Sequence, residues 1–501
     1  MTYDATFNGR RRAGRVSTRR KLGLSKAGVT GAVASVLLSV LGSLFSPDPA
    51  VVIGSGLVLA LIFLTTWQEN EPPLLFFPAF YQWMAVATKP VMTVFLRTPV
   101  NAMAEYPIDL KPGIWLALAC ISALTIGMRL ALGRPRWDWN AVLRNEAAMV
   151  TRSSILMVSI TSILIGHSLL LLTRYTASLT QPLIALANLR FLGLFALAYW
   201  CFSNRRGYLY LVGVALIEIL IGITGFFADF RAPIFVVAFA AVAVGHRPKL
   251  RDLVLGAAIG VVLIVLGSFW SSVKLDYRQF VSGGTNDQVI TVPLSDRIDY
   301  LADRVQTFDR TKFDDGFNRL LKRQSYIDFL SATMGYVPQS LPHEHGKRLG
   351  SAFLHVITPR FLFPDKAATE FDTDVTYKYT GLPIQVKSQT SISIGYVGEL
   401  YIDFGKIGAI VSCLALGLAF GAAYRFVQKN GNGSVMLSYG ARSMLIVVMM
   451  SFETALIKYI GGVAIVFASA FLLQRFAVPI LTRRLRIRAA FRRPVQPVPA
   501  T

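Results

Sequence analysis

The chain has 501 residues, of which 53% are hydrophobic and 16% are charged, and its mean hydropathy is +0.51. Soluble domains of this length do not have such a composition, so a soluble protein is excluded and a polytopic membrane protein is indicated. The net charge of +23 would indicate nucleic acid binding in a soluble protein. In a membrane protein, cytoplasmic connections carry such an excess of basic residues, so we expect no nucleic acid partner.

Runs of roughly 18 or more apolar residues recur along the chain, and each is long enough to cross a bilayer as a helix. We expect basic cytoplasmic tails at 1–26 and 477–501, a bundle of about nine spans at 27–273, a long loop at 274–405 and three more spans at 406–476. The twelve expected spans are about 27–45, 51–67, 74–96, 114–132, 155–172, 183–202, 208–226, 234–244, 253–273, 407–423, 435–450 and 457–472. Cys120, Cys201 and Cys413 all fall in these spans, which indicates neither a disulfide framework nor a thiolate metal site.

The distribution of arginine and lysine predicts the orientation. With both tails inside, the basic connections at 133–152, 204–207, 246–251 and 425–430 all fall in the cytoplasm, as K/R-biased insertion requires. The acidic connection at 68–73 is the one exception. The long loop then lies outside.

We expect the long loop to fold as a small helical cap. Its first helix is indicated by apolar residues at steps of four and three, namely Leu294, Ile298, Leu301, Val305 and Phe308. Ser295 and Asp296 are expected to cap that helix. A second helix is expected at about 314–330, with a basic side formed by Arg319, Lys322 and Arg323. A third, at about 349–357, is apolar enough to lie on the membrane face or dip into it.

Two cations are expected to do chemistry. Arg231 lies at the outer end of spans seven and eight, two residues after Asp229, where a charge is costly unless it faces a partner or a cavity. Arg360 follows Pro359, and Pro364 constrains the chain again before Lys366, so both cations are held in place. The alternatives are a structural pair with Asp229 for Arg231 and a solvated loop for Arg360.

Glu399 lies in a segment punctuated by glycines, where it is expected either to orient the cations, to act as a base or to cap span ten through an ion pair. His355, shortly before Arg360, is a second candidate base, whereas His167 is expected to be a satisfied histidine inside a span. The pair His343 and His345 is weak evidence for a metal site. The sequence has no P-loop, GxGxxG or GxSxG motif, and we expect neither metal nor cofactor.

Two motifs resemble the Wzy-type oligosaccharide repeat-unit polymerases. They are Pro359-Arg-Phe-Leu-Phe-Pro-Asp-Lys366 and Gly398-Glu-Leu-Tyr-Ile-Asp-Phe-Gly-Lys-Ile-Gly408. The turn that bears Arg231, after Gly225, is similar to an arginine-containing outer turn of that family. Ala367 departs from the pattern, since a second proline often follows the lysine.

The resemblance implies an all-α protein of about 12 transmembrane helices, GT-C-like, with one large periplasmic helical loop, in the bacterial inner membrane. Such enzymes join glycan repeat units carried on undecaprenyl diphosphate at the periplasmic face, alongside a flippase and a chain-length regulator. The residues expected to be catalytic are Arg231, Arg360, Glu399 and His355. The residues expected to contact substrate are Asp229, Arg278, Arg319, Arg323, Lys366 and Tyr401.

Two alternatives stay open. An O-antigen ligase-type transferase would use the same donor with another acceptor. A transporter of lipid-linked glycan would be favoured by mid-membrane charges and repeated halves. The clearest mid-span charges are Arg190, Glu218 and Arg442, and the sequence shows no internal repeat.

Overall fold

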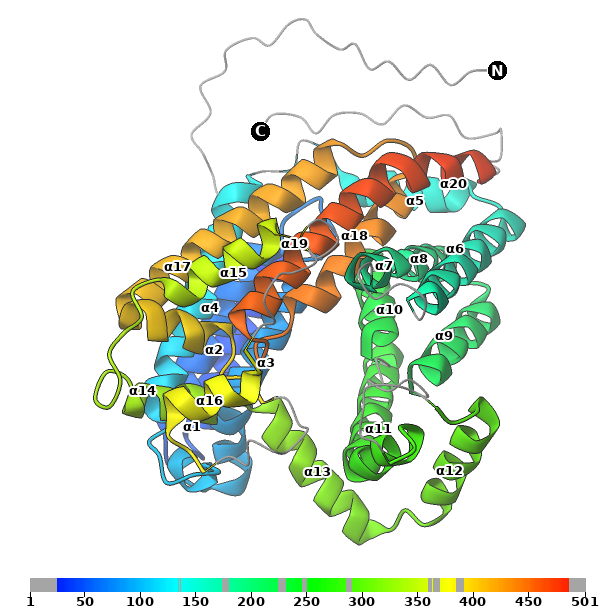
Figure 1. Ribbon diagram of the computed structural model, residues 1–501. Coiled ribbons are helices and arrows are strands. Elements are labelled where there is room, and N and C mark those ends of the chain that lie inside the picture. Colours follow the sequence, from blue (N-terminus) through cyan, green and yellow to red (C-terminus); the bar gives the residue numbers. More distant parts are fainter. Residues whose placement is uncertain are drawn as a thin grey trace, which may run out of the picture.

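The computed structural model describes residues 25–133, 135, 137–173, 180–223, 231–245, 250–284, 291–358, 363, 370–383 and 392–485. The secondary-structure elements of these residues are all helices (Figure 1). Arg360, Lys366 and Asp229 lie outside the described residues. Arg231 and Arg323 are described only as backbone positions in helices.

Eight helical runs are long and apolar enough to cross a membrane. They are α1 (Lys26–Ser43), α2 (Pro49–Thr66), α4 (Lys111–Leu132), α6 (Arg152–Leu172), α7 with α8 (Thr180–Ala187 and Leu189–Asn204), α11 (Leu250–Val281), α17 (Tyr396–Lys429), and α19 continued by a π-helical turn into α20 (Leu456–Leu472, Leu473–Ala477 and Val478–Arg484).

Further apolar helices accompany these eight. Expected spans seven, eight and eleven fall on the shorter helices α9 (Tyr208–Ile223), α10 (Arg231–Ala243) and α18 (Val435–Met449). Expected span three falls on α3 (Phe76–Leu96), which is not among the eight. By helix length and composition, the chain is a multi-pass membrane protein.

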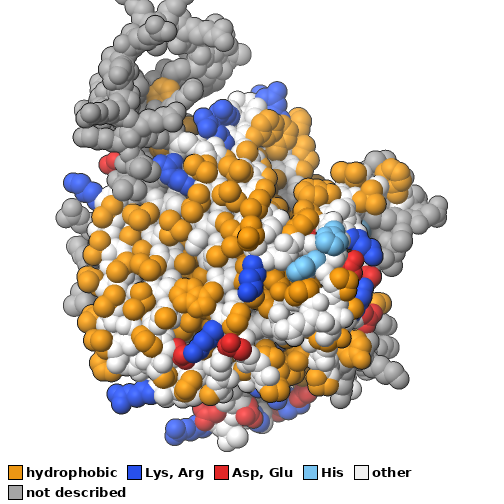
Figure 2. Space-filling model, turned by 90° about the vertical axis from the view of Figure 1, so that its left-hand side faces the viewer, with side chains coloured by type: hydrophobic (Ala, Val, Ile, Leu, Met, Phe, Trp, Pro, Cys, Tyr) orange, Lys and Arg blue, Asp and Glu red, His pale blue; other side chains and the backbone are white. Residues whose placement is uncertain are grey.

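The exterior supports this assignment. Hydrophobic side chains cover most of the face shown in Figure 2, and most of the charged side chains lie toward its edges, at the top as well as at the bottom and right. Large apolar side chains that no other helix covers include Leu38, Leu164, Leu209 and Ile407. Such side chains need an apolar environment, which the hydrocarbon of a bilayer provides.

Helices α4 and α17 pack against each other with their backbones in close approach. An added Cβ at Gly417 would lie 2.1 Å from the carbonyl oxygen of Leu124, and one at Gly127 would lie 2.3 Å from that of Leu414. Small residues let two helix backbones approach closely, which is how helices associate where the surrounding lipid is as apolar as their side chains. This contact fixes α17, which carries the candidate site.

Hydrogen bonds between distant segments show which parts of the chain lie at each end of the bundle. At one end, which we call the terminal end, Ser25 donates to the carbonyl of Trp67, and Thr482 accepts from the amide of Ser434. Both ends of the described chain therefore lie there, together with α5 (Trp139–Met149). At the opposite end, the cap end, Asp48 accepts from the amide of Val100 at the 3-10 turn η1 (Val100–Met103).

Five helices of the long loop follow α11; α12, α13, α14 and α16 lie toward the cap end, and α15 lies alongside α17 and α19 (Figure 1). They are α12 (Leu294–Gln306), α13 (Arg310–Gln324), α14 (Ile327–Tyr336), α15 (Lys347–Ile357) and α16 (Asp372–Thr380). Helices α12 and α15 confirm two of the three expected loop helices. The loop is shorter than expected at both ends, because α11 continues to Val281 and α17 begins at Tyr396.

Two details of the expected loop were wrong. The helix expected at 314–330 is two helices, because the chain leaves helical geometry at Ser325 and the amide of Tyr326 donates to the carbonyl of Ala85 on α3. Ser295 does not cap α12, which begins at Leu294; its hydroxyl instead donates to Asp296 at 2.8 Å. Asp328 of α14 is paired with Lys89 of α3, so α14 is fastened to the bundle.

Candidate site at the start of helix α17

The first segment of α17, residues 396–403, is buried although it contains two carboxylates and two tyrosine hydroxyls. It ends at Gly405, whose backbone has φ 67 and ψ −168 and interrupts the helix. A residue with a Cβ would be strained in that conformation. Buried polar groups destabilise a fold unless they are paired, so the partners of Glu399, Tyr401 and Asp403 define the site.

Glu399, only 2% exposed, has partners on both carboxylate oxygens. Its Oε2 accepts from Nε of Arg348 at 2.7 Å, and its Oε1 accepts from the backbone amide of Leu456 at 3.0 Å. The carboxylate thus joins α17 to α15 and to the start of α19. Glu399 is therefore held in a buried ion pair with Arg348, which is not one of the cations expected from the sequence.

Asp403 holds the start of α15. Its Oδ1 accepts from the amide of Arg348 at 3.0 Å, and its Oδ2 accepts from the amide of Leu349 at 2.8 Å. The first amides of a helix lack partners within that helix, and the N-cap residue here, Gly346, has no side chain to offer. A carboxylate from α17 therefore replaces the usual cap and fixes the position of Arg348.

Arg348 is the centre of the cluster. Its side chain is 15% exposed, its Nη1 lies 3.3 Å from Glu370, and its guanidinium lies over the ring of Tyr379 at 5.6 Å. Burial opposes the charge, but Glu399 and Glu370 outweigh it and raise the pKa of Arg348 further above its ordinary value. The guanidinium is a permanent charge between two carboxylates, one buried and one exposed.

A second group of charges surrounds this pair. Glu344 accepts from the hydroxyl of Tyr379 at 2.6 Å and lies within 3.8 Å of Lys347 and Lys378. The hydrogen bond from Tyr379, followed by the two lysines, lowers the pKa of Glu344 below its usual value against the opposing effect of burial. Glu344 is therefore ionised in the folded protein at neutral pH.

This shift predicts a pH dependence of stability. A carboxylate whose pKa is lowered by folding stabilises the fold above its unfolded pKa of about 4.5, and this contribution is lost as the pH falls through the lower folded value. Glu344→Gln should therefore flatten the fall in melting temperature below about pH 4.5. The prediction is tested by measuring the melting temperatures of wild type and Glu344→Gln across that pH range. Glu105→Gln, which changes an exposed carboxylate, is the control. Parallel curves for wild type and Glu344→Gln would contradict the prediction.

Beside the same segment lies an open cavity of about 520 Å³, a size typical of ligand sites. It is lined by Pro107, Ile108, Asp109, Pro112, Ser331, Met334, Gly335, Pro338, Tyr401 and Lys406. Tyr401 stands in its wall, with its hydroxyl donating to the carbonyl of Val337 at 2.8 Å. A fixed aromatic ring, an acid and a lysine in one cavity are suited to a polar ligand with an apolar face.

The structure brings some of the expected residues together and separates others. Glu399 and Tyr401 lie on the same segment of α17, and His355 lies half-buried near the end of α15, which packs against α17 and α19. Arg278 and Arg319 lie instead on α11 and α13, which pack against each other in another part of the cap end (Figure 1). Arg231 is the first residue of α10.

Sequence reasoning missed Arg348, Glu370, Asp403 and Asp109. One signal was present: Glu399 and Asp403 are four residues apart and so share one face of a helix. Buried carboxylates require partners, either cations or backbone amides, and the basic pair Lys347 and Arg348 lies in the loop. Nothing local indicates which basic residue supplies the charge.

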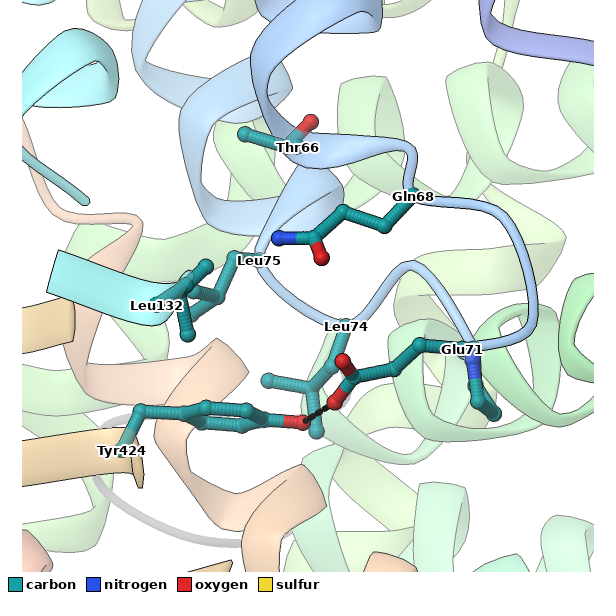
Figure 3. A pocket seen from close by; sticks show the side chains of 8 residues that line it. Thr66, Gln68, Glu71, Leu74, Leu75, Leu132 and Tyr424 are labelled. Carbon is teal, nitrogen blue, oxygen red and sulfur yellow. Dashed lines mark hydrogen bonds between the residues drawn. The ribbon is translucent and has the colours of Figure 1, made fainter. Parts of the chain in front are cut away.

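A second polar cluster lies at the terminal end. Glu71 accepts from Tyr424, Tyr439 and Gln428, at 3.3, 3.3 and 2.8 Å, and Arg442 donates to Tyr424 at 3.1 Å. Figure 3 shows Glu71 and Tyr424 beside a small hollow, whose other walls are Thr66, Gln68, Pro72, Leu74, Leu75 and Leu132. The hydroxyl of Tyr424 links the acidic connection at 68–73 to Arg442, since it donates to Glu71 and accepts from Arg442.

Among the residues that the structure describes, no group of three or more His, Cys, Asp or Glu is placed to hold a metal ion. The Nδ1 of His343 donates to the carbonyl of Ile402, 3.1 Å away, and its ring lies edge-on to the ring of Tyr401. His343 therefore supports the wall of the cavity.

These observations define a multi-pass, helical membrane protein with a charged cluster and a cavity at its cap end. Residues 140–432, more than half of the chain, match the family described as a domain of unknown function, DUF8712, and the chain belongs to that family. Comparisons with curated proteins and with solved structures gave no match.

Proposed function

We propose that the protein polymerises glycan repeat units carried on undecaprenyl diphosphate, at the outer face of the bacterial inner membrane. In this proposal the chain crosses the membrane about twelve times with both termini in the cytoplasm. The cap end then faces the periplasm, and the architecture is GT-C-like. The resemblance of the 359–366 and 398–408 motifs to Wzy-type polymerases supplies the hypothesis.

The observation that carries the proposal is the placement of α15. Arg348 and Asp403 fasten its start to α17, and Val356 near its other end lies 3.8 Å from where a Cβ of Gly461 on α19 would be. The helix therefore runs along two membrane-spanning helices, with Phe353 and Ile357 exposed. An amphipathic helix in this position lies where the hydrocarbon meets the headgroups, the depth of a lipid-linked diphosphate.

The chain that leaves α15 carries the proposed diphosphate ligands, since Arg360 follows Ile357 by three residues. In the proposed reaction an acceptor hydroxyl attacks the anomeric carbon of the donor glycan. The bond from that carbon to the diphosphate oxygen breaks, and the lipid diphosphate leaves with the electron pair. Guanidinium groups stabilise the charge that develops on the leaving oxygens. The cavity beside Tyr401 would receive glycan.

Purified protein in lipid nanodiscs, given an undecaprenyl-diphosphate-linked oligosaccharide, tests the proposal. A ladder of lengthened glycans with equimolar release of undecaprenyl diphosphate is expected. A single transfer to another acceptor would indicate a ligase instead, and movement of intact substrate across sealed vesicles would indicate a transporter. Absence of a ladder with substrate from the protein's own source would refute polymerisation.

The proposed orientation predicts which introduced cysteines a membrane-impermeant reagent can reach. Ser340, exposed at the cap end, should be labelled in intact cells after Ser340→Cys, whereas Asn432→Cys at the terminal end should be labelled only after permeabilisation. The native cysteines are buried and supply the background control. Labelling of Asn432→Cys alone in intact cells would reverse the orientation.

A further inference from the structure

Three exposed arginines lie at the terminal end, where α6 and α9 begin and α8 ends. They are Arg152, the first residue of α6, and Arg205 and Arg206, which directly follow α8. The guanidinium carbon of Arg152 lies 4.2 Å from the ring centre of Tyr210 on α9, and that of Arg206 lies 5.0 Å from the ring of Trp200 on α8. Aromatic rings thus hold two of the three cations in place.

The two arginine–aromatic pairs belong to one surface. The indole nitrogen of Trp200 donates at 3.1 Å to the carbonyl of Val150, two residues before Arg152. Gly207 lies between the two rings, because a Cβ added to it would be 3.0 Å from Trp200 and 3.8 Å from Tyr210. Its φ of 80° lets the chain turn directly from α8 into α9. We call the surface that the three arginines form the arginine patch.

Within the described part of the chain, no carboxylate pairs with the arginine patch, and no acceptor takes a hydrogen bond from its guanidinium groups. The carboxylates of α5, which packs against α8, are used elsewhere: Glu146 accepts from the amide of Met436, and Asp138 caps α5 at the amide of Ala141. A cation in the first turn of a helix opposes the helix dipole, so Arg152 does not stabilise α6. The patch therefore presents uncompensated positive charge at the surface.

Exposed apolar side chains begin directly beside the arginine patch. On α9 they are Leu209, Val212 and Leu216, each about one helical turn after the last, and on α6 they are Met157 and Ile160. Arginine and tyrosine at the ends of membrane spans lie at the level of the lipid headgroups. A phospholipid at this place would meet positive charge with its phosphate and apolar surface with its acyl chains.

We propose that the arginine patch binds the headgroup of an anionic phospholipid, which by the proposed orientation belongs to the cytoplasmic leaflet. The guanidinium groups donate to the phosphate oxygens, and the acyl chains lie along the exposed faces of α6 and α9. The patch offers no carboxylate to an ammonium group, so it favours a headgroup of net negative charge over a zwitterionic one. The inference does not depend on the proposed glycan transfer.

Native mass spectrometry of the full-length protein in a neutral detergent tests the proposal. The protein is titrated with phosphatidylglycerol and, separately, with phosphatidylcholine, and phosphatidylglycerol should bind at least about fivefold more tightly. Arg152→Gln and Arg206→Gln should each weaken phosphatidylglycerol binding by about fivefold, and the double variant by about 10–30-fold.

Arg97→Gln is the matched control for these variants. Like Arg205, Arg97 is exposed and ends its helix in the left-handed conformation, but it follows α3 at the cap end. Its replacement removes the same charge from the protein and should leave the affinity for phosphatidylglycerol unchanged. An equal loss in Arg97→Gln and Arg206→Gln would show a general effect of net charge and overturn the proposal.

Two further measurements separate a lipid from other ligands and binding from folding. Glycerol 3-phosphate has a phosphate but no acyl chains; if it binds as tightly as phosphatidylglycerol, the patch serves a soluble phosphate and the proposal is wrong. Added phosphatidylglycerol should raise the melting temperature of the wild type more than that of the Arg152→Gln, Arg206→Gln double variant. Equal affinities of these two proteins for phosphatidylglycerol, or equal affinities of the wild type for the two lipids, would overturn the proposal.

Discussion

Replacement of Arg348 by alanine should lower the free energy of unfolding by about 3–5 kcal/mol, because it leaves a buried carboxylate without its charged partner. Glu399 is 2% exposed and would keep only the amide of Leu456. The amides at the start of α15 would keep their hydrogen bonds to Asp403, so the loss of stability should come from the broken Arg348–Glu399 ion pair. Chemical or thermal unfolding of purified protein in detergent measures the loss.

Lys347→Ala is the matched control, because Lys347 is the adjacent residue and its side chain is 75% exposed, 3.6 Å from Glu344. Exposed ion pairs contribute about 0–1 kcal/mol. Glu399→Gln combined with Arg348→Ala should recover part of the loss, since no unpaired charge remains buried. Equal effects of Arg348→Ala and Lys347→Ala would show that the pair does not hold α15 to α17.

Arg360→Ala and Arg231→Ala should each reduce polymer formation by about 10²–10³-fold at normal protein level. The reason is that a diphosphate in a poorly hydrated site needs more than one charge-assisted donor. Lysine in place of either arginine should be nearly as damaging if the contact is bidentate. Initial rates in the nanodisc assay measure the effect.

Lys322→Ala provides the control for these variants, because it removes a cation from the exposed surface of α13 at the cap end. It should leave the rate within about twofold of wild type. Full-length polymer at the wild-type rate from both arginine variants would rule out the diphosphate site. Loss of rate in Lys322→Ala of the same size would show a general effect of positive charge.

Helices that are determined by the pattern of neighbouring residues could be predicted from the sequence. The amphipathic spacing of 294–306 and the apolar runs follow from helical periodicity and bilayer thickness. Helix α12 formed as expected, and the apolar runs lie on helices, of which eight runs are long and apolar enough to cross a membrane. The division of 314–330 could not be predicted, because it depends on a hydrogen bond from Tyr326 to Ala85, 241 positions away. Tertiary contact there overrides a continuous helical pattern.

In the candidate site, too, some features could be predicted from local sequence and others depend on tertiary contacts. Glu399 stood out because a carboxylate in an apolar, glycine-punctuated segment needs a partner. Its partner, Arg348, is 51 residues away and has no motif of its own. Arg190 and Glu218 were visible as mid-span charges, but only the packing of α6, α8 and α9 brings His167 to them.

The central claim is that the cap end binds a lipid-linked diphosphate, and cross-linking tests it most directly. A photoactivatable undecaprenyl diphosphate analogue would be bound to the purified protein in nanodiscs, irradiated, and the adducts mapped by mass spectrometry. The account predicts adducts on α15 and on the start of α17, which unlabelled undecaprenyl diphosphate displaces and Arg360→Ala abolishes. Adducts confined to the terminal end near Glu71, or cap-end adducts that unlabelled lipid does not displace, would contradict it.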